Sequence, residues 1–296
     1  MPEPMHAPAV SRRAFFVFGL LGLLGFAAAT AAPGPGTNQP QTYVQFAPLD
    51  QAEGRRILAQ FRQAGIAGEY YLEFDLRVMP RRGDERIFHG RLWGGRNGQG
   101  AVMRVAVVDA SGHERRLLIQ NGEQSAVWCS DSAATAPRMV GAFEPLVPGV
   151  ELTAFELQMP YIYWPDATLV SVDRVRGRPA HGFFFQPPAA WAARYPEFGA
   201  VRAYLDTQFN APVQTELLDQ KGHIVRTLSL VDLKKIGNQY IVKSIDLRND
   251  VTRDKTRFQV TAAALGLEFV GAVFEPARLS EDIRPPAAAQ LTRVAP

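Results

Sequence analysis

The side chains that most often do chemistry in enzymes are few and scattered in this sequence. Of its five histidines, His89, His113, His181 and His223 follow the apolar run near the N-terminus, and no two of them stand four residues apart. None sits in the kind of Asp/Glu ligand pattern that completes a metal site. The spacing therefore predicts no metal site and no cofactor.

The single cysteine and a glycine-rich run have simpler structural interpretations. Cys129 is the only cysteine, so the chain has no intramolecular disulfide, and beside Trp128 in an apolar strand it is expected to be a small buried hydrophobe. Gly94–Gly100 (GGRNGQG) lacks the Lys-Ser/Thr ending of a phosphate loop and stands between two strands, which indicates a hairpin turn. With no G-x-S-x-G elbow either, we expect a protein that is not an enzyme. A cavity-based enzyme is the disfavoured alternative.

Apolar binding is the chemistry that the remaining residues support. Each buried acyl methylene contributes about 0.8 kcal/mol, so a cavity for one long chain gains on the order of ten kcal/mol before costs. For each candidate lipid-contacting residue, ordinary core packing is the alternative. Over 102–108 both faces of the strand are apolar, so the sequence does not decide which face points inward. The candidates are Leu72, Phe74, Leu76, Val78, Met103, Val105, Val107, Met159, Tyr161, Trp164, Phe183 and Phe185.

A helix and a series of strands must position these side chains. Asp50 and Glu53 have capping-box spacing, and apolar residues follow at helical spacing until Gly65, which predicts an amphipathic helix of about four turns. The period then changes to two, and apolar and charged residues alternate over 72–78 as in a half-buried strand. Turns rich in Gly, Pro, Asn and Asp separate further predicted strands over 86–93, 102–108, 116–120 and 126–129.

The middle of the chain interrupts this series. Thr153 and Glu156 have capping-box spacing and begin a predicted helical segment, apolar and aromatic, that Pro165 ends. Strands then resume over 169–175, 182–186, 200–207, 213–218, 224–230, 239–247 and 256–262. Without βαβ alternation, the pattern predicts a mainly β (α+β) fold, a curled antiparallel sheet whose apolar face a few helices cover. The Pro/Ala-rich tail after Phe274 is expected to be loose or packed along the surface.

The N-terminus has the three parts of an export signal. Ser11-Arg12-Arg13 is basic, Ala14 to Ala29 is uncharged and apolar, and Ala29-Thr30-Ala31 is a small-x-small cleavage pattern. We expect a signal peptide over 1–31, cleaved after Ala31, with an uncleaved membrane anchor as the alternative. The paired arginines suit the twin-arginine route and an ordinary secretory signal equally.

Charge excludes one class of partner. Removing the signal peptide, which carries Glu3, Arg12 and Arg13, takes the formal net charge from +3 to +2. Because so small a surplus gives no electrostatic footprint for nucleic acid, we expect no nucleic-acid partner.

Three stretches, in their order and spacing, resemble the LolA-like outer membrane lipoprotein-sorting proteins, the periplasmic carriers of acylated proteins. Residues 147–157 (VPGVELTAFEL) resemble the family's Pro-Gly turn before a short helix, although Val150 stands where Thr or Asp is more usual. Residues 172–188 resemble a strand, glycine turn and strand ending in proline. Residues 201–228 resemble consecutive strands, with Asp206 at one strand end and an Asp-x-x-Gly turn. The resemblance does not place the arginine that latches the lid in the family's carriers.

The resemblance implies a half-open β-barrel of about eleven antiparallel strands, LolA/LolB-like, whose interior holds acyl chains. It implies a monomeric periplasmic carrier of lipoproteins or other lipids, with an inner-membrane donor and an outer-membrane acceptor as partners. The alternative is a sensor or scaffold that uses the same fold to bind a protein. The expected organisation is a signal peptide (1–31), a Pro/Gly linker (32–47), the half-barrel domain (48–280) and the tail (281–296).

Overall fold

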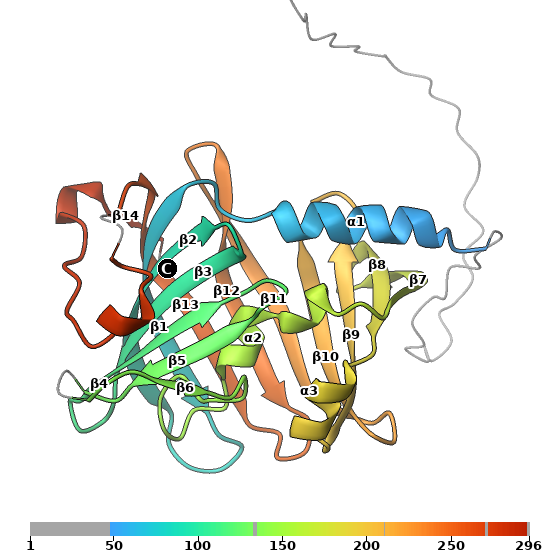
Figure 1. The fold of residues 1–296 in the computed structure, drawn as a ribbon, viewed down its shortest axis with the longest axis horizontal. Helices are drawn as coiled ribbons and strands as arrows, with labels where there is room; N and C mark the ends of the chain where they lie inside the picture. Colours follow the sequence, from blue (N-terminus) through green and yellow to red (C-terminus); the bar gives the residue numbers. More distant parts are fainter. Residues whose placement is uncertain (1–47, 133–134, 210, 270–271, 295–296) are drawn as a thin grey trace, which may run out of the picture. The chain divides into compact units, whose positions relative to one another are not determined.

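The computed structural model describes residues 48–132, 135–209, 211–269 and 272–294, and these residues form one antiparallel sheet with few helices (Figure 1). The predicted signal peptide and linker lie outside the described residues. No helix of the described ranges is both long and apolar enough to cross a membrane. The predicted fold class is confirmed: the sheet is open, and the helices lie against it rather than alternating with its strands.

The sheet consists of two meanders joined by one non-local pairing. Within each meander every strand pairs with the next strand of the chain. The first meander comprises β1 (Glu69–Met79), β2 (Arg86–Asn97), β3 (Gly100–Val108), β4 (Glu114–Gln120), β5 (Ala126–Ser130) and β6 (Arg138–Val140). The second comprises β7 (Ala167–Val175), β8 (Arg178–Phe185), β9 (Phe198–Asp206), β10 (Pro212–Asp219), β11 (Ile224–Ile236), β12 (Gln239–Asn249) and β13 (Lys255–Leu267). A two-residue β14 (Thr292–Arg293) adds to β13. The described strands exceed the expected eleven because the first meander and the C-terminus add short ones.

The pairing of β1 with β13 joins the two meanders. The two strands run antiparallel along their whole length, with Leu76 opposite Phe258 and Phe74 opposite Val260. The rings of Phe74 and Phe258 stack with their centroids 4.4 Å apart. This pairing sets the two meanders side by side and leaves β6 and β7 as the edges of the sheet.

Side chains divide the sheet into an inner and an outer face. On β1 the alternate residues Leu72, Phe74, Leu76 and Val78 are buried in the main core, as the period of two predicts. Tyr71 points the other way, into a separate outer cluster with Trp93. The inner face therefore carries the main apolar surface of the fold.

Two glycines of β2 make room for aromatic rings on β1. A Cβ on Gly90 would lie 2.2 Å from Cζ of Phe74, and a Cβ on Gly94 would lie 2.1 Å from Cζ of Tyr70. The turn predicted over 94–100 is wrong in extent, because β2 continues to Asn97. The hairpin itself is confirmed: Asn97 pairs with Gly100, and its Oδ1 accepts the N–H of Gly100.

Helix α1 (Gln51–Gln63) begins where the sequence predicts. Oδ1 of Asp50 accepts the N–H of Ala52, so Asp50 is the N-cap. The predicted capping box is wrong in its second half, because Glu53 binds Arg56 instead of turning back. The apolar stripe of Ile57, Leu58 and Phe61 is buried. This stripe holds α1 against the sheet at the β7 end (Figure 1).

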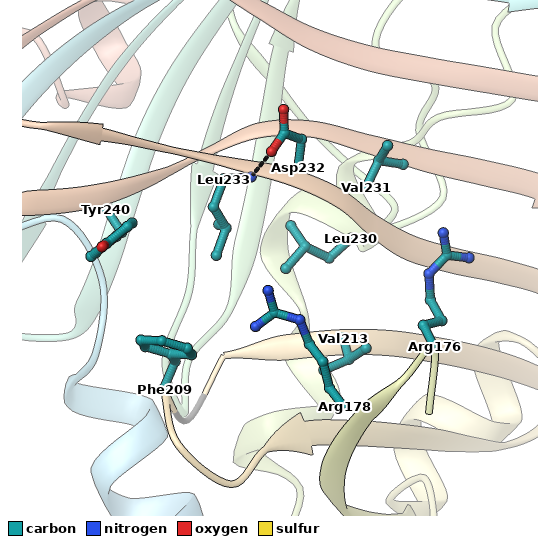
Figure 2. A pocket seen from close by; sticks show the side chains of 9 residues that line it. All are labelled: Arg176, Arg178, Phe209, Val213, Leu230, Val231, Asp232, Leu233 and Tyr240. Carbon is teal, nitrogen blue, oxygen red and sulfur yellow. Dashed lines mark hydrogen bonds between the residues drawn. The ribbon is translucent and has the colours of Figure 1, made fainter. Parts of the chain in front are cut away.

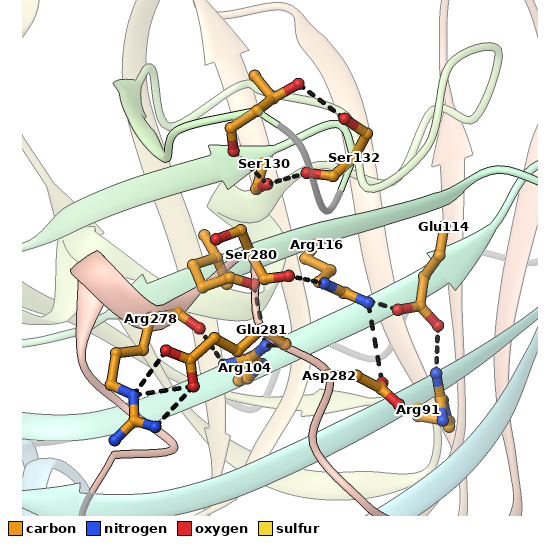
Figure 3. A network of polar contacts seen from close by, with 12 residues as sticks. Arg91, Arg104, Glu114, Arg116, Ser130, Ser132, Arg278, Ser280, Glu281 and Asp282 are labelled. Atoms are coloured by element: carbon orange, nitrogen blue, oxygen red, sulfur yellow. Dashed lines mark hydrogen bonds and ion pairs between the residues drawn. The ribbon is translucent and has the colours of Figure 1, made fainter.

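The C-terminal segment 272–294 packs on the sheet. It contains the short helices η2 (Pro276–Arg278) and η3 (Ala288–Gln290). Leu279 is fully buried against Val102 and Leu118, on the outer face. Arg104, 1% exposed, donates hydrogen bonds from its guanidinium to the backbone carbonyls of Arg278 (3.2 Å), Leu279 (2.9 Å) and Glu281 (Figure 3).

A second outer-face arginine strengthens this attachment. Arg116 binds Glu114 at 2.7 Å and also donates to the carbonyl of Ser280 (Figure 3). Glu114 in turn pairs with Arg91. The segment is thus fixed to β3 and β4 through its backbone carbonyls as well as through its buried apolar side chains.

Candidate functional site

The interior of the sheet is occupied by the segment that joins its two edges. Residues 141–166, here called the cover segment, connect β6 to β7 and contain α2 (Ala154–Gln158) and η1 (Pro160–Tyr163). Its first half buries Leu146 and Val147 completely in the main core. Its second half buries Phe155, Tyr161 and Trp164 in a second core cluster on β7–β10. One stretch of chain therefore lines both halves of the interior.

The helix predicted from Thr153 is shorter than expected. The capping box is confirmed, because Glu156 accepts the N–H of Thr153 at 2.9 Å. α2 then stops at Met159, whose φ is +47°, and a 3₁₀ turn follows. The following Pro160 explains the break, because a residue before proline is hindered from α-helical geometry.

An arginine of the sheet binds the cover segment at its helix. Arg226 on β11 donates to Oε1 of Glu156 at 3.2 Å, and its guanidinium lies 5.7 Å from the centre of the Phe143 ring. Both charged groups are largely removed from solvent, Glu156 to 5% side-chain exposure and Arg226 to 20%. Removing Arg226 would leave the carboxylate of Glu156 buried without its counterion, whereas Arg226 also lies 3.8 Å from the carboxylate of Glu151. We call this ion pair the Arg226–Glu156 latch.

Further polar contacts hold the α2–η1 part of the cover segment on two sides. Nε2 of the buried Gln158 donates to the carbonyls of Gln120 (2.8 Å) and Ala126 (3.2 Å), on β4 and β5. On the side of α1, Arg62 donates to the carbonyl of Ile162 at 2.8 Å, and its guanidinium lies over the Tyr163 ring.

Helix α1 is itself tied to the edge strand β7. The side-chain amide of Gln51 donates to the carbonyl of Leu169 at 2.8 Å and accepts the N–H of the same residue at 3.0 Å. Gln51 thus satisfies the backbone of an edge strand as a neighbouring strand would. The cover segment, α1 and β7 therefore form one connected lid over this end of the interior.

An aromatic cluster packs around the second half of the cover segment. Trp191, on the short helix α3 (Ala189–Arg194), lies 4.8 Å from Trp164 and 5.8 Å from Phe143 between ring centres. Phe143 stacks on Phe155 at 4.7 Å. Tyr195 accepts the N–H of Ala142 at 2.8 Å. Aromatic rings from the cover segment and from α3 thus close the interior by packing, without the continuous backbone hydrogen bonds that join neighbouring strands.

The space left under the cover segment is small. A void of about 10 Å³ lies between α2–η1 and strands β10–β12, with Phe155, Tyr161, Leu217 and Leu228 among its lining residues. Tyr161 is buried there and its hydroxyl lies 3.1 Å from Oγ1 of Thr215. Burial raises the pKa of Tyr161, so the phenol stays neutral. With the cover segment in place, the interior is packed.

The residues predicted to contact lipid fall into the two core clusters. Ten of the twelve are buried, and Met103 and Met159 pack partly buried against them. The main core contains Leu72, Phe74, Leu76, Val78, Val105 and Val107, with Met103 packed against it. The second contains Tyr161, Trp164, Phe183 and Phe185, with Met159 packed against it. The structure brings each set together on the inner face, where the cover segment contacts both.

Sequence reasoning missed the polar half of this site. Arg226, Gln158 and Arg62 come from three separate elements, and nothing in their spacing indicates a common partner. The aromatic pair Trp191 and Tyr195 did carry a signal, since residues four apart share one face of a helix.

The residues that could have served as reactive groups have structural roles. His89 and His223 lie at the surface and pair with Asp75 (2.7 Å) and Asp219 (3.1 Å). Among the described residues no three His, Cys, Asp or Glu side chains come together as metal ligands. Cys129 is buried in the main core, and burial raises the pKa of its thiol to about 11, which keeps it protonated at neutral pH.

Comparison with known proteins identifies the fold. A family model described as "Uncharacterized protein" matches residues 168–281, and no curated protein matches the chain in sequence. A DUF1329 family protein from Desulfovibrio piger superposes with a TM-score of 0.66 at 12% identity, over 77% of this chain and 98% of its own. A domain from Vibrio parahaemolyticus described as an outer membrane lipoprotein-sorting protein gives 0.66 at 15% identity, over 78% and 100%.

A third solved structure extends this result. A LolA superfamily protein from Nitrosomonas europaea superposes with a TM-score of 0.58 at 11% identity, over 75% of this chain and 96% of its own. The predicted resemblance to LolA-like proteins is therefore confirmed at the level of the fold, an open β-barrel with few helices.

Proposed function

We propose that this protein is a periplasmic carrier that binds the acyl chains of lipoproteins or other lipids between its inner face and a displaced cover segment. The observation that carries the proposal is the construction of the interior. A strongly apolar sheet face is filled by a separate connecting segment, and that segment is held there by its own buried side chains and by a few polar contacts such as the Arg226–Glu156 latch. The sorting role in the name of the Vibrio parahaemolyticus domain, which shares the fold, supports the same proposal.

Lipid entry in this proposal requires movement. The void of about 10 Å³ has room for about one water molecule and none for an acyl chain. An acyl chain must therefore replace side chains of the cover segment. These are Phe155, Tyr161 and Trp164 against β8, and Leu146 and Val147 against β1 and β3. The twelve candidate residues named from the sequence are the proposed contacts, with Met159, Tyr161 and Trp164 on the moving side.

The remaining parts of the proposal concern location and partners. An export signal over 1–31, cleaved after Ala31, would deliver the chain to the periplasm. There it would act without enzymatic activity, as a monomer, between an inner-membrane donor and an outer-membrane acceptor.

A second candidate function is a sensor or scaffold that binds a protein and never opens. The packed interior is the observation that favours it, because a carrier must give up this packing to load. In that case the aromatic cluster would be an ordinary part of the hydrophobic core and would not move.

One experiment separates the two functions. The exported protein, purified from the periplasm of a bacterial host, is examined by native mass spectrometry before and after organic extraction. It is also titrated with an apolar fluorescent dye that fatty acid can displace. Extra mass released as lipid, together with displacement of the dye, supports the carrier. A clean apo mass with no uptake of dye, phospholipid or lipopeptide rejects it in favour of the scaffold.

A further inference from the structure

A second hollow, which shares no lining residue with the void under the cover segment, lies beside β11 (Figure 2). It has a volume of about 750 Å³, and its lining comes from four places in the chain. These are the β7–β8 turn with Arg176, the start of β8, the β9–β10 loop with Phe209, and strands β10 to β12. None of the twelve candidate lipid contacts lines it.

One wall of this hollow is an unpaired strand edge. β11 extends over residues 224–236, but its pairing with β10 ends at Ser229, opposite Gln214. β10 itself begins at Pro212, which has no N–H with which to continue the ladder. Residues 232–236 of β11 therefore pair with β12 alone among the described strands, and residues 230–233 line the hollow.

A local hydrogen bond marks the open edge. The backbone N–H of Leu233 donates to Oδ1 of Asp232 at 2.8 Å (Figure 2). The Asp232 carboxylate thus accepts a hydrogen bond from a backbone N–H of the strand. A carbonyl or carboxylate of an added strand would offer the same kind of acceptor.

The side walls are apolar and exposed. Phe209 is 47% exposed and Tyr240 57% exposed, and their ring centres lie 6.1 Å apart where the β9–β10 loop meets the β11–β12 hairpin. Val213 and Leu230 also line the hollow, to the right of both rings in Figure 2. Exposed aromatic rings beside an open strand edge provide side-chain pockets for an extended peptide.

The charge around the hollow is positive. Of the lining residues, Arg176 is exposed and makes no ion pair within the described ranges, and Arg178 pairs with Asp206 at 3.2 Å. Just beyond the lining, on β11, Lys234 is exposed without an ion pair among the described residues and Lys235 lies over the Tyr240 ring. The carboxylate of Asp232 is already paired with Lys243 at 3.1 Å. An occupant with negative charge is therefore favoured.

We propose that this hollow binds an extended acidic segment of a partner protein, which adds as a strand along residues 231–236 of β11. Six residues span about 20 Å at roughly 3.3 Å each, so the segment is a short one. A peptide is favoured over a lipid surface because only a second main chain satisfies a row of strand donors and acceptors. The inference goes beyond lipid carriage and does not depend on it.

The test uses fluorescence anisotropy with the whole exported protein. The probe is a labelled octapeptide in which valine and glutamate alternate. The comparison peptides replace glutamate with lysine, or carry N-methyl groups on alternate amides, which block strand pairing. We expect the acidic peptide to bind at least about tenfold more tightly than either. In hydrogen exchange, the amides of residues 231–236 should become protected only with the acidic peptide.

Charge-reversal variants locate the site. The double variant Arg176→Glu, Lys234→Glu should weaken binding of the acidic peptide by about tenfold or more. The matched control Arg55→Glu, Arg284→Glu changes the net charge equally at exposed positions away from the hollow and should leave binding unchanged.

Three results would overturn the inference: equal binding of the lysine peptide, equal loss in the control variant, or no protection at 231–236. Binding to vesicles of phosphatidylglycerol that Arg176→Glu, Lys234→Glu abolishes, with no peptide binding, would overturn it too and assign the surface to membranes. Lipid uptake is measured separately, so failure here leaves the carrier proposal standing.

Discussion

The guanidinium of Arg226 on β11 lies 3.2 Å from the carboxylate of Glu156 on α2, and that carboxylate also accepts the N–H of Thr153 that starts the helix. One buried acid thus caps the helix of the cover segment and binds the cover segment to the sheet. Opening the interior must break the ion pair but need not unwind the helix. In the proposed carrier, α2 would therefore stay folded while the ion pair breaks.

The first prediction concerns this latch. Arg226→Met should accelerate uptake of an apolar dye and lower the free energy of unfolding by roughly 1–3 kcal/mol, because Glu156 loses its counterion while staying buried. Stopped-flow dye binding and urea unfolding measure the two effects. Arg56→Met, which breaks an exposed pair with Glu53, is the control and should change neither. Unchanged uptake in Arg226→Met would show that the ion pair does not gate the interior.

A second prediction concerns the C-terminal segment. Arg104→Met should speed hydrogen exchange at the amides of Leu279 and Glu281, because carbonyls of this segment lose the buried guanidinium that binds them. Burial lowers the pKa of Arg104 to about 10, so the group is still charged at neutral pH. A stability loss of about 3 kcal/mol is expected from hydrogen bonds to a charged group. Arg278→Met, which removes only an exposed pair with Glu281, should leave the exchange of Leu279 slow.

The third prediction tests the close contact of β1 with β2. Gly90→Ala should lower the melting temperature by about 3–10 °C, since its Cβ would lie 2.2 Å from Cζ of Phe74 and crowding a core costs about 1–3 kcal/mol. Calorimetry measures the shift. Gly98→Ala has no atom within 4 Å of its new Cβ and is the control. Adding Phe74→Leu to Gly90→Ala should restore part of the loss; a further drop would contradict the steric explanation.

A fourth prediction concerns acid. Asp246 on β12 binds Arg257 at 2.7 and 2.9 Å and Lys255 at 2.7 Å, both on β13. Burial acts to raise the pKa of Asp246, but the hydrogen bonds and charges of the two cations outweigh it and hold the pKa below its usual value. Because the folded pKa is depressed, the stabilisation is complete above the unfolded value of about 3.9 and is lost as the pH falls through the folded one.

Urea unfolding of the wild type and of Asp246→Asn checks this sign. The difference in stability between them should be constant from about pH 7 to pH 5 and should shrink below about pH 4. A difference that stays constant down to the lowest pH at which both proteins fold would disprove the linkage.

The sequence predicted the inner face well where one face of a strand was clearly apolar. The alternation from Leu72 to Val78 placed four core residues correctly. Over 102–108 both faces are apolar, and the structure shows why: Val105 and Val107 face the main core, while Val102 and Ala106 lie under the C-terminal segment. That segment has no periodicity of its own, and it is bound in part through its backbone carbonyls. Sequence patterns carry no signal for such an attachment.

Contacts between distant residues account for the rest of what sequence could not provide. Arg226 and Glu156 stand 70 positions apart, and Gln51 and Leu169 stand 118 apart. Nothing local distinguishes these polar residues from an ordinary solvated surface. The break at Met159, by contrast, had a local signal in Pro160 that the helical spacing of the aromatic residues obscured.

The β1–β13 pairing also determines when during synthesis the fold can be completed. Each meander pairs only neighbouring strands, so each can form early from local contacts, whereas β1 must wait for residues 255–267, almost the last part of the chain to be made. Until then β1 exposes an unpaired edge of eleven residues with an apolar inner face, and such an edge is a template for aggregation. A chain truncated before β13 would retain that hazard permanently. Such truncations should be recovered as insoluble material or bound to chaperones rather than as a smaller folded domain.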